Sequence, residues 1–275
     1  MNIVEVYKTF PTQDSCIEHL EKVKWNGKPV CPYCKSSKVS SAPKEKRHHC
    51  NNCNTSFSVT VGTIFHKTKV DFQKWFVAIS LVLNAKKRIS ARQLARDIHV
   101  TKDTAWFMGM RIRKAMEEYG NLLKGIVEVD ETYVGGKPRK GTMNNPNDSG
   151  TGNKRGRKTA KIPVVGMVER GGKVRAKVML KTNQISLSKL VRENIDPRMC
   201  QVFTDEFKGY LKLKGFVEHR TVNHSIGQYA DGIVHTNTIE GFWALLKRGI
   251  VGQYHKVSVA YLPKYINEFC YRYNY

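Results

Sequence analysis

The spacing of four cysteines constrains the fold of this chain more than any other feature. Cys31-Pro-Tyr-Cys34 is followed, after fifteen residues, by Cys50-Asn-Asn-Cys53. Each Cys-x-x-Cys pair directs two thiolates to one point, and four thiolates complete a tetrahedral zinc shell with no position left for chemistry. The pattern therefore predicts a structural zinc site in a zinc ribbon, a sheet too small to hold a core without its metal. The alternative, four unrelated buried cysteines, is disfavoured by this spacing.

The residues around these cysteines suggest the shape of the ribbon. A short helix is expected over residues 12–25, and residues 55–65, which alternate and are rich in Thr, Val and Phe, predict a strand. His48 and His49 could each replace a cysteine ligand, but with four cysteines present we expect both at the surface. The other three cysteines are scattered, which fits reduced thiols in a cytosolic compartment better than a disulfide framework.

A second module follows the zinc ribbon. From residue 71 apolar residues recur at helical spacing, and further on Ser90 and Thr101 can cap two short helices that meet at a tight turn. This predicts a helix-turn-helix, with a plain helical hairpin as the alternative. Docked in a major groove, the second helix would read bases with its N-terminal residues and hold phosphates with its arginines. The expected DNA contacts here are Lys102, Thr104, Arg111 and Arg113.

The net charge indicates a polyanionic partner. The chain has 47 basic and 23 acidic side chains, hence +24. Residues 1–124 carry 22 − 10 = +12 and residues 125–275 carry 25 − 13 = +12. The excess is not confined to a tail, and a long polyanion that contacts every domain explains this even distribution best; a merely soluble basic protein is the alternative. Together with the predicted helix-turn-helix, this makes double-stranded DNA the expected partner. A membrane partner is not expected, because the longest apolar run, residues 75–83, is too short to span a bilayer and the start lacks a secretory pattern.

Beyond residue 122 the pattern becomes mixed α/β. Strands are expected over residues 126–131, 163–169, 173–180, 201–204 and 218–223, and helices over residues 187–194, 238–248 and 261–273. The order of strand, hairpin, helix, strand, strand and helix predicts a ribonuclease H-like mixed sheet flanked by helices. Residues 135–161 hold eight basic residues and one acid, and we expect a flexible insertion that orders on DNA. The expected domains are residues 1–68 (helix and zinc ribbon), 69–122 (helix-turn-helix) and 123–275 (catalytic).

Three acids fall where this fold could gather them. Asp130 ends one expected strand, Asp205 follows another, and Glu240 lies on a helix. Such a set can hold two hard divalent cations such as Mg²⁺, which together activate a nucleophile and stabilise a leaving oxygen in phosphodiester cleavage. We expect Asp130 to bridge the two ions, Asp205 to bind as a ligand and Glu240 to complete the shell of the second ion. Glu128 shares a strand face with Asp130 and is an alternative ligand.

The motifs at these positions resemble a known family. Residues 129–137 (VDETYVGGK), 204–206 (TDE) and 235–248 (HTNTIEGFWALLKR) look like the catalytic motifs of bacterial insertion-sequence transposases that carry a DDE site and an N-terminal zinc ribbon. The resemblance covers nearly the whole chain. It implies cleavage at transposon ends and attack of the freed 3′ hydroxyl on target DNA, with Mg²⁺ or Mn²⁺ as cofactor.

The resemblance also extends to single residues. It implies that Lys247, seven residues after Glu240, touches the transposon end, and Arg248 beside it is a further expected DNA contact. Some relatives use another residue in place of the third acid, which leaves Asn237 and His235 as alternatives to Glu240. Because two ends must be joined, we expect a homodimer or a larger assembly on DNA. The expected location is the cytoplasm of a bacterium, in association with its nucleoid. Two other functions stay open: a non-catalytic DNA-binding protein derived from a transposase, and a different nuclease of the same fold.

Overall fold

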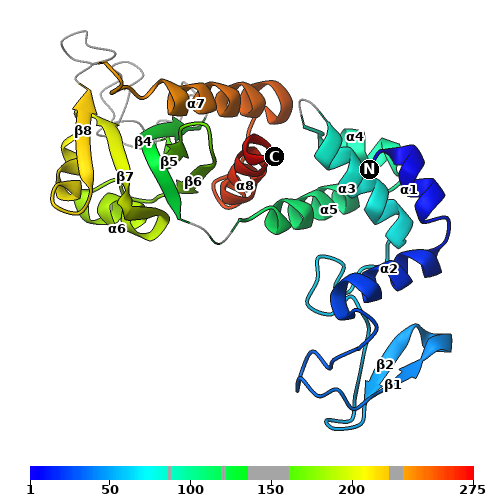
Figure 1. The fold of residues 1–275 in the computed structure, drawn as a ribbon. Coiled ribbons are helices and arrows are strands. Elements are labelled where there is room, and N and C mark those ends of the chain that lie inside the picture. The colour runs from blue at the N-terminus through cyan, green and yellow to red at the C-terminus, as the bar shows by residue number, and fades with distance from the viewer. Residues whose placement is uncertain (86–87, 119, 121, 136–160, 223–231) are drawn as a thin grey trace, which may run out of the picture. The chain divides into compact units, whose positions relative to one another are not determined.

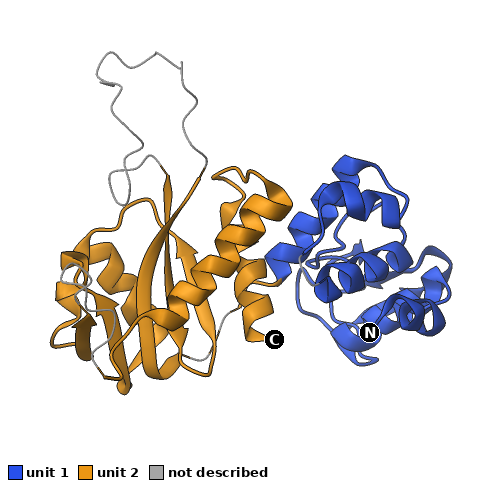
Figure 2. Cartoon of the chain, turned by 90° about the horizontal axis from the view of Figure 1, so that it is seen from above, with its two compact units in different colours: residues 1–115 blue, residues 116–275 orange. Residues whose placement is uncertain are grey.

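The computed structural model describes residues 1–275 except 86–87, 119, 121, 136–160 and 223–231. The chain divides into two compact units, residues 1–115 and residues 116–275 (Figures 1 and 2). The finer division into three domains stays a prediction. The expected basic insertion at 135–161 lies almost entirely outside the described residues. None of the described helices is long and apolar enough to cross a membrane.

The first unit is mainly helical. Its helices are α1 (Ile3–Thr9), α2 (Gln13–Trp25), α3 (Phe72–Asn84), α4 (Ala91–Asp97) and α5 (Lys102–Ala115). Helix α2 begins after Thr12, whose side chain accepts a hydrogen bond from the Ser15 backbone N–H at 3.2 Å. The buried side of α2 includes Cys16, whereas the apolar side chain of Val23 is 71% exposed.

The zinc ribbon is a three-stranded antiparallel sheet in the order β1 (Val39–Ala42), β2 (Arg47–Cys50) and β3 (Thr55–Phe57). The strand predicted over residues 55–65 therefore ends at Phe57. The chain then turns, with the Val61 N–H donating to the Ser58 carbonyl and the Thr63 N–H to the Thr60 carbonyl. These local bonds replace ladder bonds, and Gly62 at φ +75° supplies a turn conformation that a strand excludes.

Helices α4 and α5 are two capped helices joined by a short turn. The Ser90 side chain accepts a bond from the Gln93 N–H, and the Thr101 side chain accepts one from the Thr104 N–H, both at 3.2 Å. Between the helices His99 takes a left-handed conformation at φ +51°. The predicted pair of caps is therefore confirmed, and the use of this pair of helices as a DNA-reading helix-turn-helix is taken up below as a proposal.

The second unit is built on one mixed sheet. Its strands are β4 (Leu123–Val134), β5 (Ile162–Glu169), β6 (Val174–Val178), β7 (Ile195–Asp205) and β8 (Glu218–Val222), in the order β6-β5-β4-β7-β8. Strand β5 pairs antiparallel with both β4 and β6, whereas β7 pairs parallel with both β4 and β8. The predicted order of elements is confirmed, although β4 and β7 extend several residues beyond their predicted bounds.

Helices cover both faces of this sheet (Figures 1 and 2). They are α6 (Gln184–Asn194), α7 (Asn237–Gly249) and α8 (Leu262–Asn274), with a 3₁₀ segment η3 (Lys208–Leu213) and a π-helical turn η5 (Ile250–Tyr254) after α7. Val127 and Val129 of β4 pack in one core cluster with Leu187 of α6. The alternate residues of the strand, Glu128 and Asp130, face α7 on the other side of the sheet, as strand alternation requires.

Candidate functional site

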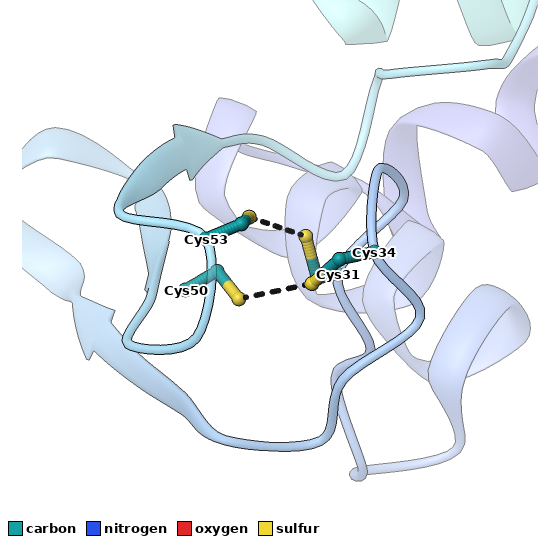
Figure 3. Close-up of side chains that lie close together, drawn as sticks. All are labelled: Cys31, Cys34, Cys50 and Cys53. Carbon is teal, nitrogen blue, oxygen red and sulfur yellow. Dashed lines mark hydrogen bonds between the residues drawn. The ribbon is translucent and has the colours of Figure 1, made fainter.

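The four paired cysteines converge in the first unit (Figure 3). The sulfurs of Cys31 and Cys53 are 3.6 Å apart, those of Cys34 and Cys50 are 3.5 Å apart, and all four lie within 4.8 Å of one another. A tetrahedral shell with Zn–S bonds of about 2.3 Å places its sulfurs about 3.8 Å apart. The observed spacing fits a structural zinc ion and leaves no open position for a substrate.

The protein around this cluster favours the thiolate form, which zinc requires, at Cys34. The Ser36 backbone N–H and the Asn52 side chain, which lies 3.7 Å from the sulfur, lower the pKa of Cys34 to about 6. The Cys31 N–H donates to the Ser36 carbonyl and the Lys35 N–H to the Cys31 carbonyl, which closes the first turn. Thiolate, not thiol, is the metal-binding form, so Cys34 is prepared for the ion. At Cys53 a hydrogen bond with Thr55 lowers the pKa, but burial and the neighbouring thiols together raise it to about 11, so this thiol would lose its proton as the metal binds.

His48 is not a surface residue, and the expectation that it would be was wrong. Its side chain is buried, and its Nε2 lies 2.8 Å from Oε1 of Glu21 on α2. The ring packs edge-on against Trp25 and stacks on Phe57. A three-stranded sheet has few residues to bury, so the β2 position that faces α2 becomes core whatever its side chain. His49, on the opposite face, contacts Ser56 instead.

In the second unit, Asp130 and Asp205 lie on adjacent parallel strands. Glu128 of β4 pairs with Phe203 of β7, and Asp130 and Asp205 each follow two residues later, so strand alternation directs both side chains to the same face of the sheet. Burial, followed by the charges of Glu131 and Asp205, raises the pKa of Asp130 to about 7. A carboxyl group with this environment favours its neutral form unless a cation compensates the charge.

Glu240 lies on α7, whose mid-helix residue Trp243 contacts the same sheet face. The carboxylate of Glu240 is exposed and accepts a hydrogen bond from the Thr236 hydroxyl at 3.1 Å. Within the described part of the chain, the four cysteines are the one group of three or more potential ligand residues whose atoms lie within 4.8 Å. Asp130, Asp205 and Glu240 therefore do not close into one compact shell in this structure.

Glu128, the alternative metal ligand, makes structural hydrogen bonds to α7 and Arg170. It is fully buried, and its carboxylate accepts hydrogen bonds from the Thr238 N–H and hydroxyl, both at 2.8 Å, and from the Ile239 N–H at 3.0 Å. Arg170 donates to it at 2.6 Å, and His235 Nδ1 lies 3.3 Å away. The carboxylate thus caps the N-terminus of α7, where the free amides and the helix dipole favour a negative charge.

Two further hydrogen bonds near the acids were not predicted from the sequence. The indole N–H of Trp243 donates to an oxygen of Asp130 at 3.0 Å, and the Tyr210 hydroxyl donates to Glu131 at 2.8 Å. The helical spacing of Trp243 from Glu240 was the available signal for the first of these. No sequence spacing pointed to Tyr210.

The predicted DNA contacts fall into two groups. Lys102, Lys247 and Arg248 are exposed, and Thr104 is half-buried. Arg113 is buried, so it does not present its guanidinium to a phosphate, and this prediction needs correction. Arg111 donates to the carbonyls of Ile64 and His66, both at 2.7 Å, and so ties α5 to the loop after the ribbon. Helix α5 is amphipathic, and its inward side includes the positions of these two arginines.

His235 and Asn237, the alternatives to Glu240, occupy different environments. His235 belongs to the Glu128–Arg170 network, because Arg170 lies 2.9 Å from its Nδ1 and donates to its carbonyl at 3.0 Å. Asn237 is the first residue of α7 and is exposed. Both remain alternatives to Glu240 in the proposed site.

Comparisons with known proteins agree with the two modules. Residues 122–274, more than half of the chain, match the model of the ISXO2-like transposase domain, and residues 11–56 match the transposase zinc-ribbon domain. A protein of the transposable element ISH50 from Halobacterium salinarum, described as uncharacterized, is 29% identical over 271 residues, which is 95% of this chain and 91% of the relative. Because that relative is archaeal, the expected restriction to bacteria is not supported.

Solved structures give only distant likenesses. The Mos1 strand transfer complex is 12% identical with a TM-score of 0.35, covering 70% of this chain and 69% of that one. An intasome of simian T-cell lymphotropic virus in complex with a PP2A regulatory subunit is 14% identical with a TM-score of 0.28, covering 66% and 61%. Scores this low carry no argument. The family match, together with the four-cysteine cluster, does: the chain belongs to the IS1595 family of transposases, with a transposase zinc ribbon and an ISXO2-like DDE catalytic domain.

Proposed function

We propose that this protein binds the ends of its own transposable element, cleaves phosphodiester bonds there, and joins the freed 3′ ends to target DNA. The observation that supports the proposal is the pair Asp130 and Asp205: the two acids lie on the adjacent parallel strands β4 and β7, and the charge of Asp205 contributes to the raised pKa of Asp130. The strand order β6-β5-β4-β7-β8, with two antiparallel and two parallel pairings, supports a ribonuclease H-like fold. Family membership supplies the reaction class.

The residues present suit hard divalent cations. Asp130 and Asp205 offer carboxylate oxygens. Burial, followed by the charges of Glu131 and Asp205, raises the pKa of Asp130, and a nearby cation would stabilise its charged form. Asp130, Asp205 and Glu240 would hold Mg²⁺ or Mn²⁺. When bound, such a pair of ions activates the attacking oxygen and stabilises the leaving one. Glu240 would complete the set by a change in its exposed side chain, which only the Thr236 hydroxyl is seen to hold here.

The other residues of α7 have supporting roles in the proposal. Lys247 lies on the same helix face as Glu240 and would hold a phosphate of the element end, with Arg248 beside it. In the first unit, α4 and α5 would act as a helix-turn-helix, with Lys102 and Thr104 near the start of the reading helix. Arg111 and Arg113 are left out of this surface because of their contacts and burial. Two copies would be needed to join two ends.

The test is a cleavage and strand-transfer assay on the full chain with a duplex that carries the element's own ends, in Mg²⁺. We expect nicked and joined products from the wild type, none from Asp130→Asn or Asp205→Asn, and unchanged end binding by both variants. Glu240→Gln, Asn237→Ala and His235→Ala then identify the third residue, since its variant alone should match the two aspartate variants.

The competing function is a DNA-binding protein without catalysis. It is favoured by one observation: Asp130, Asp205 and Glu240 do not close into a compact shell. It predicts footprints on the element ends, no cleavage with either metal, and indifference to Asp205→Asn. Cleavage by the wild type that depends on Asp205 would exclude it.

A further inference from the structure

Trp243 contacts Asp130 in a defined geometry. The indole is 3% exposed, and its Nε1 donates to Oδ2 of Asp130 at 3.0 Å. An indole nitrogen is only a donor, so the direction of this bond is unambiguous. A buried Trp N–H needs an acceptor, and here the acceptor is one of the two oxygens of a proposed metal ligand.

The main chain of the neighbouring strand is shaped to seat this ring. Gly166 of β5 is the cross-strand partner of Asp130. A Cβ atom at position 166 would lie 2.6 Å from Cη2 and 2.7 Å from Cζ2 of Trp243, distances that real Cβ atoms do not reach. The φ angle of Gly166 is not in the left-handed region, so glycine is required there for space and not for backbone conformation.

The ring is also held from its other sides. Trp243 belongs to the core cluster under α7 and α8, and its ring centroid lies 5.2 Å from that of Phe242. Ile239, one helical turn earlier, contacts the same space above Gly166 at 3.0 Å from the position of a Cβ. The indole therefore has little freedom to leave Asp130.

We propose that Trp243 is a positioning residue for Asp130: seated over Gly166, its N–H holds one carboxylate oxygen of Asp130 and so orients the carboxylate that would bind the cation. The proposal rests on the proposed function and adds a residue to that site. Carboxylates that bind metals are commonly held by a hydrogen-bonding partner, and loss of such a partner lowers metal affinity or activity by about 10- to 100-fold. A role in packing alone would need the ring and not its N–H.

The test separates the N–H from the ring. Trp243→Phe keeps an aromatic ring and removes the donor. The full, zinc-loaded chain is titrated with Mn²⁺, and binding that Asp130→Asn abolishes is counted as binding at the site. We expect Trp243→Phe to weaken this Mn²⁺ binding about 10- to 100-fold, and to lower the cleavage rate at saturating DNA while the affinity for element ends stays unchanged.

Trp75→Phe is the matched control. Trp75 is equally buried, and its indole N–H also donates one bond, to the Thr68 hydroxyl at 2.8 Å, but it lies in the first unit. We expect this variant to lose stability without any change in Mn²⁺ affinity. Gly166→Ala is the second test variant, since it keeps the indole and displaces it; its Mn²⁺ affinity should fall as well. This second variant decides the question if Trp243→Phe does not fold.

The outcomes distinguish the inference from the proposed function. Wild-type Mn²⁺ affinity in Trp243→Phe, or in a folded Gly166→Ala, overturns the positioning role even if the wild type cleaves DNA. Asp130-dependent Mn²⁺ binding that weakens in both variants supports the role even if no cleavage is found, in which case the proposed function alone fails. Absence of Asp130-dependent Mn²⁺ binding in the wild type overturns both.

Discussion

Replacing Glu128 by alanine should destabilise the second unit strongly. The carboxylate is fully buried and receives the Thr238 N–H and hydroxyl, the Ile239 N–H and the Arg170 guanidinium. Removing one partner of a buried ion pair lowers the free energy of unfolding by about 3–5 kcal/mol, and losing a helix cap lowers it by about 1 kcal/mol. These losses overlap because they involve the same two oxygens, so they should not be added.

The lower end of this range applies to Glu128. Arg170 keeps other acceptors in the variant, namely the carbonyls of Ile233 and His235. Its side chain is also 21% exposed, so water can reach it. We therefore expect a loss of about 3 kcal/mol, and for a unit of this size that corresponds to a decrease in Tm of roughly 6–12 °C.

The assay is urea unfolding of the full chain combined with hydrogen exchange of the α7 amides. Exchange should accelerate at Thr238 and Ile239, because their acceptor is gone. Glu218→Ala is the control, since Glu218 also pairs with an arginine on a strand but is 47% exposed, and exposed pairs contribute about 0–1 kcal/mol. If Glu128→Ala unfolds like Glu218→Ala and leaves exchange in α7 unchanged, the anchoring of α7 by Glu128 is wrong.

Three further predictions follow from the metal sites and the charges. Cys50→Ser, or a strong zinc chelator, should unfold the ribbon and release zinc in a metal analysis, whereas Cys16→Ala, buried outside the cluster, should retain zinc. The pKa of Asp130 is raised to about 7, so without divalent cations the folded state binds its proton more tightly than the unfolded state does. The stability of the second unit should then fall as pH rises from about 4 to about 7, which urea unfolding across this pH range checks. Mn²⁺ should bind more tightly as pH rises through about 7, which Mn²⁺ titration at several pH values checks. Asp130→Asn should remove the pH dependence of the stability and that of Mn²⁺ binding. Lys247→Ala should reduce the salt dependence of end binding by about 0.9 in the slope of log K against log salt concentration, whereas Lys189→Ala, on the opposite face of the sheet, should leave that slope unchanged.

The spacing of residues along the sequence correctly predicted those features that form between residues close together in the chain. Two Cys-x-x-Cys turns bring their own thiolates together, so Cys31, Cys34, Cys50 and Cys53 were identifiable without any tertiary information. The caps Ser90 and Thr101 likewise act within three residues. The order of strands and helices in the second unit was also predictable, because periodicity changes where one element ends and the next begins.

Burial decided the features that the sequence did not predict. Arg113 and His48 are polar residues that lie in the core. The end of β3 at Phe57 depends on turn bonds among Ser58, Thr60 and Thr63 that compete with a strand of favourable composition. In each case a tertiary or local hydrogen bond overrode a correct reading of propensity.

The two contacts of α7 with β4 together explain why the site was only partly predictable. Glu128 holds the helix at residues 238–239, and Asp130 holds it at Trp243. The two attachment points on α7 are four to five residues apart, which is a little more than one helical turn. Strand β4 therefore fixes α7 at two points and not at one.

This double attachment determines where Glu240 can reach. At 100° per residue, Glu240 is turned by about 60° from Trp243 and by about 20° from Lys247 around the helix axis. It therefore lies beside, and not beneath, the helix face that contacts the sheet, which agrees with its exposed carboxylate. Because both attachments restrict rotation of α7, Glu240 would approach Asp130 by rotation of its own side chain. A variant that releases either attachment should then weaken cation binding even though it leaves all three acids in place.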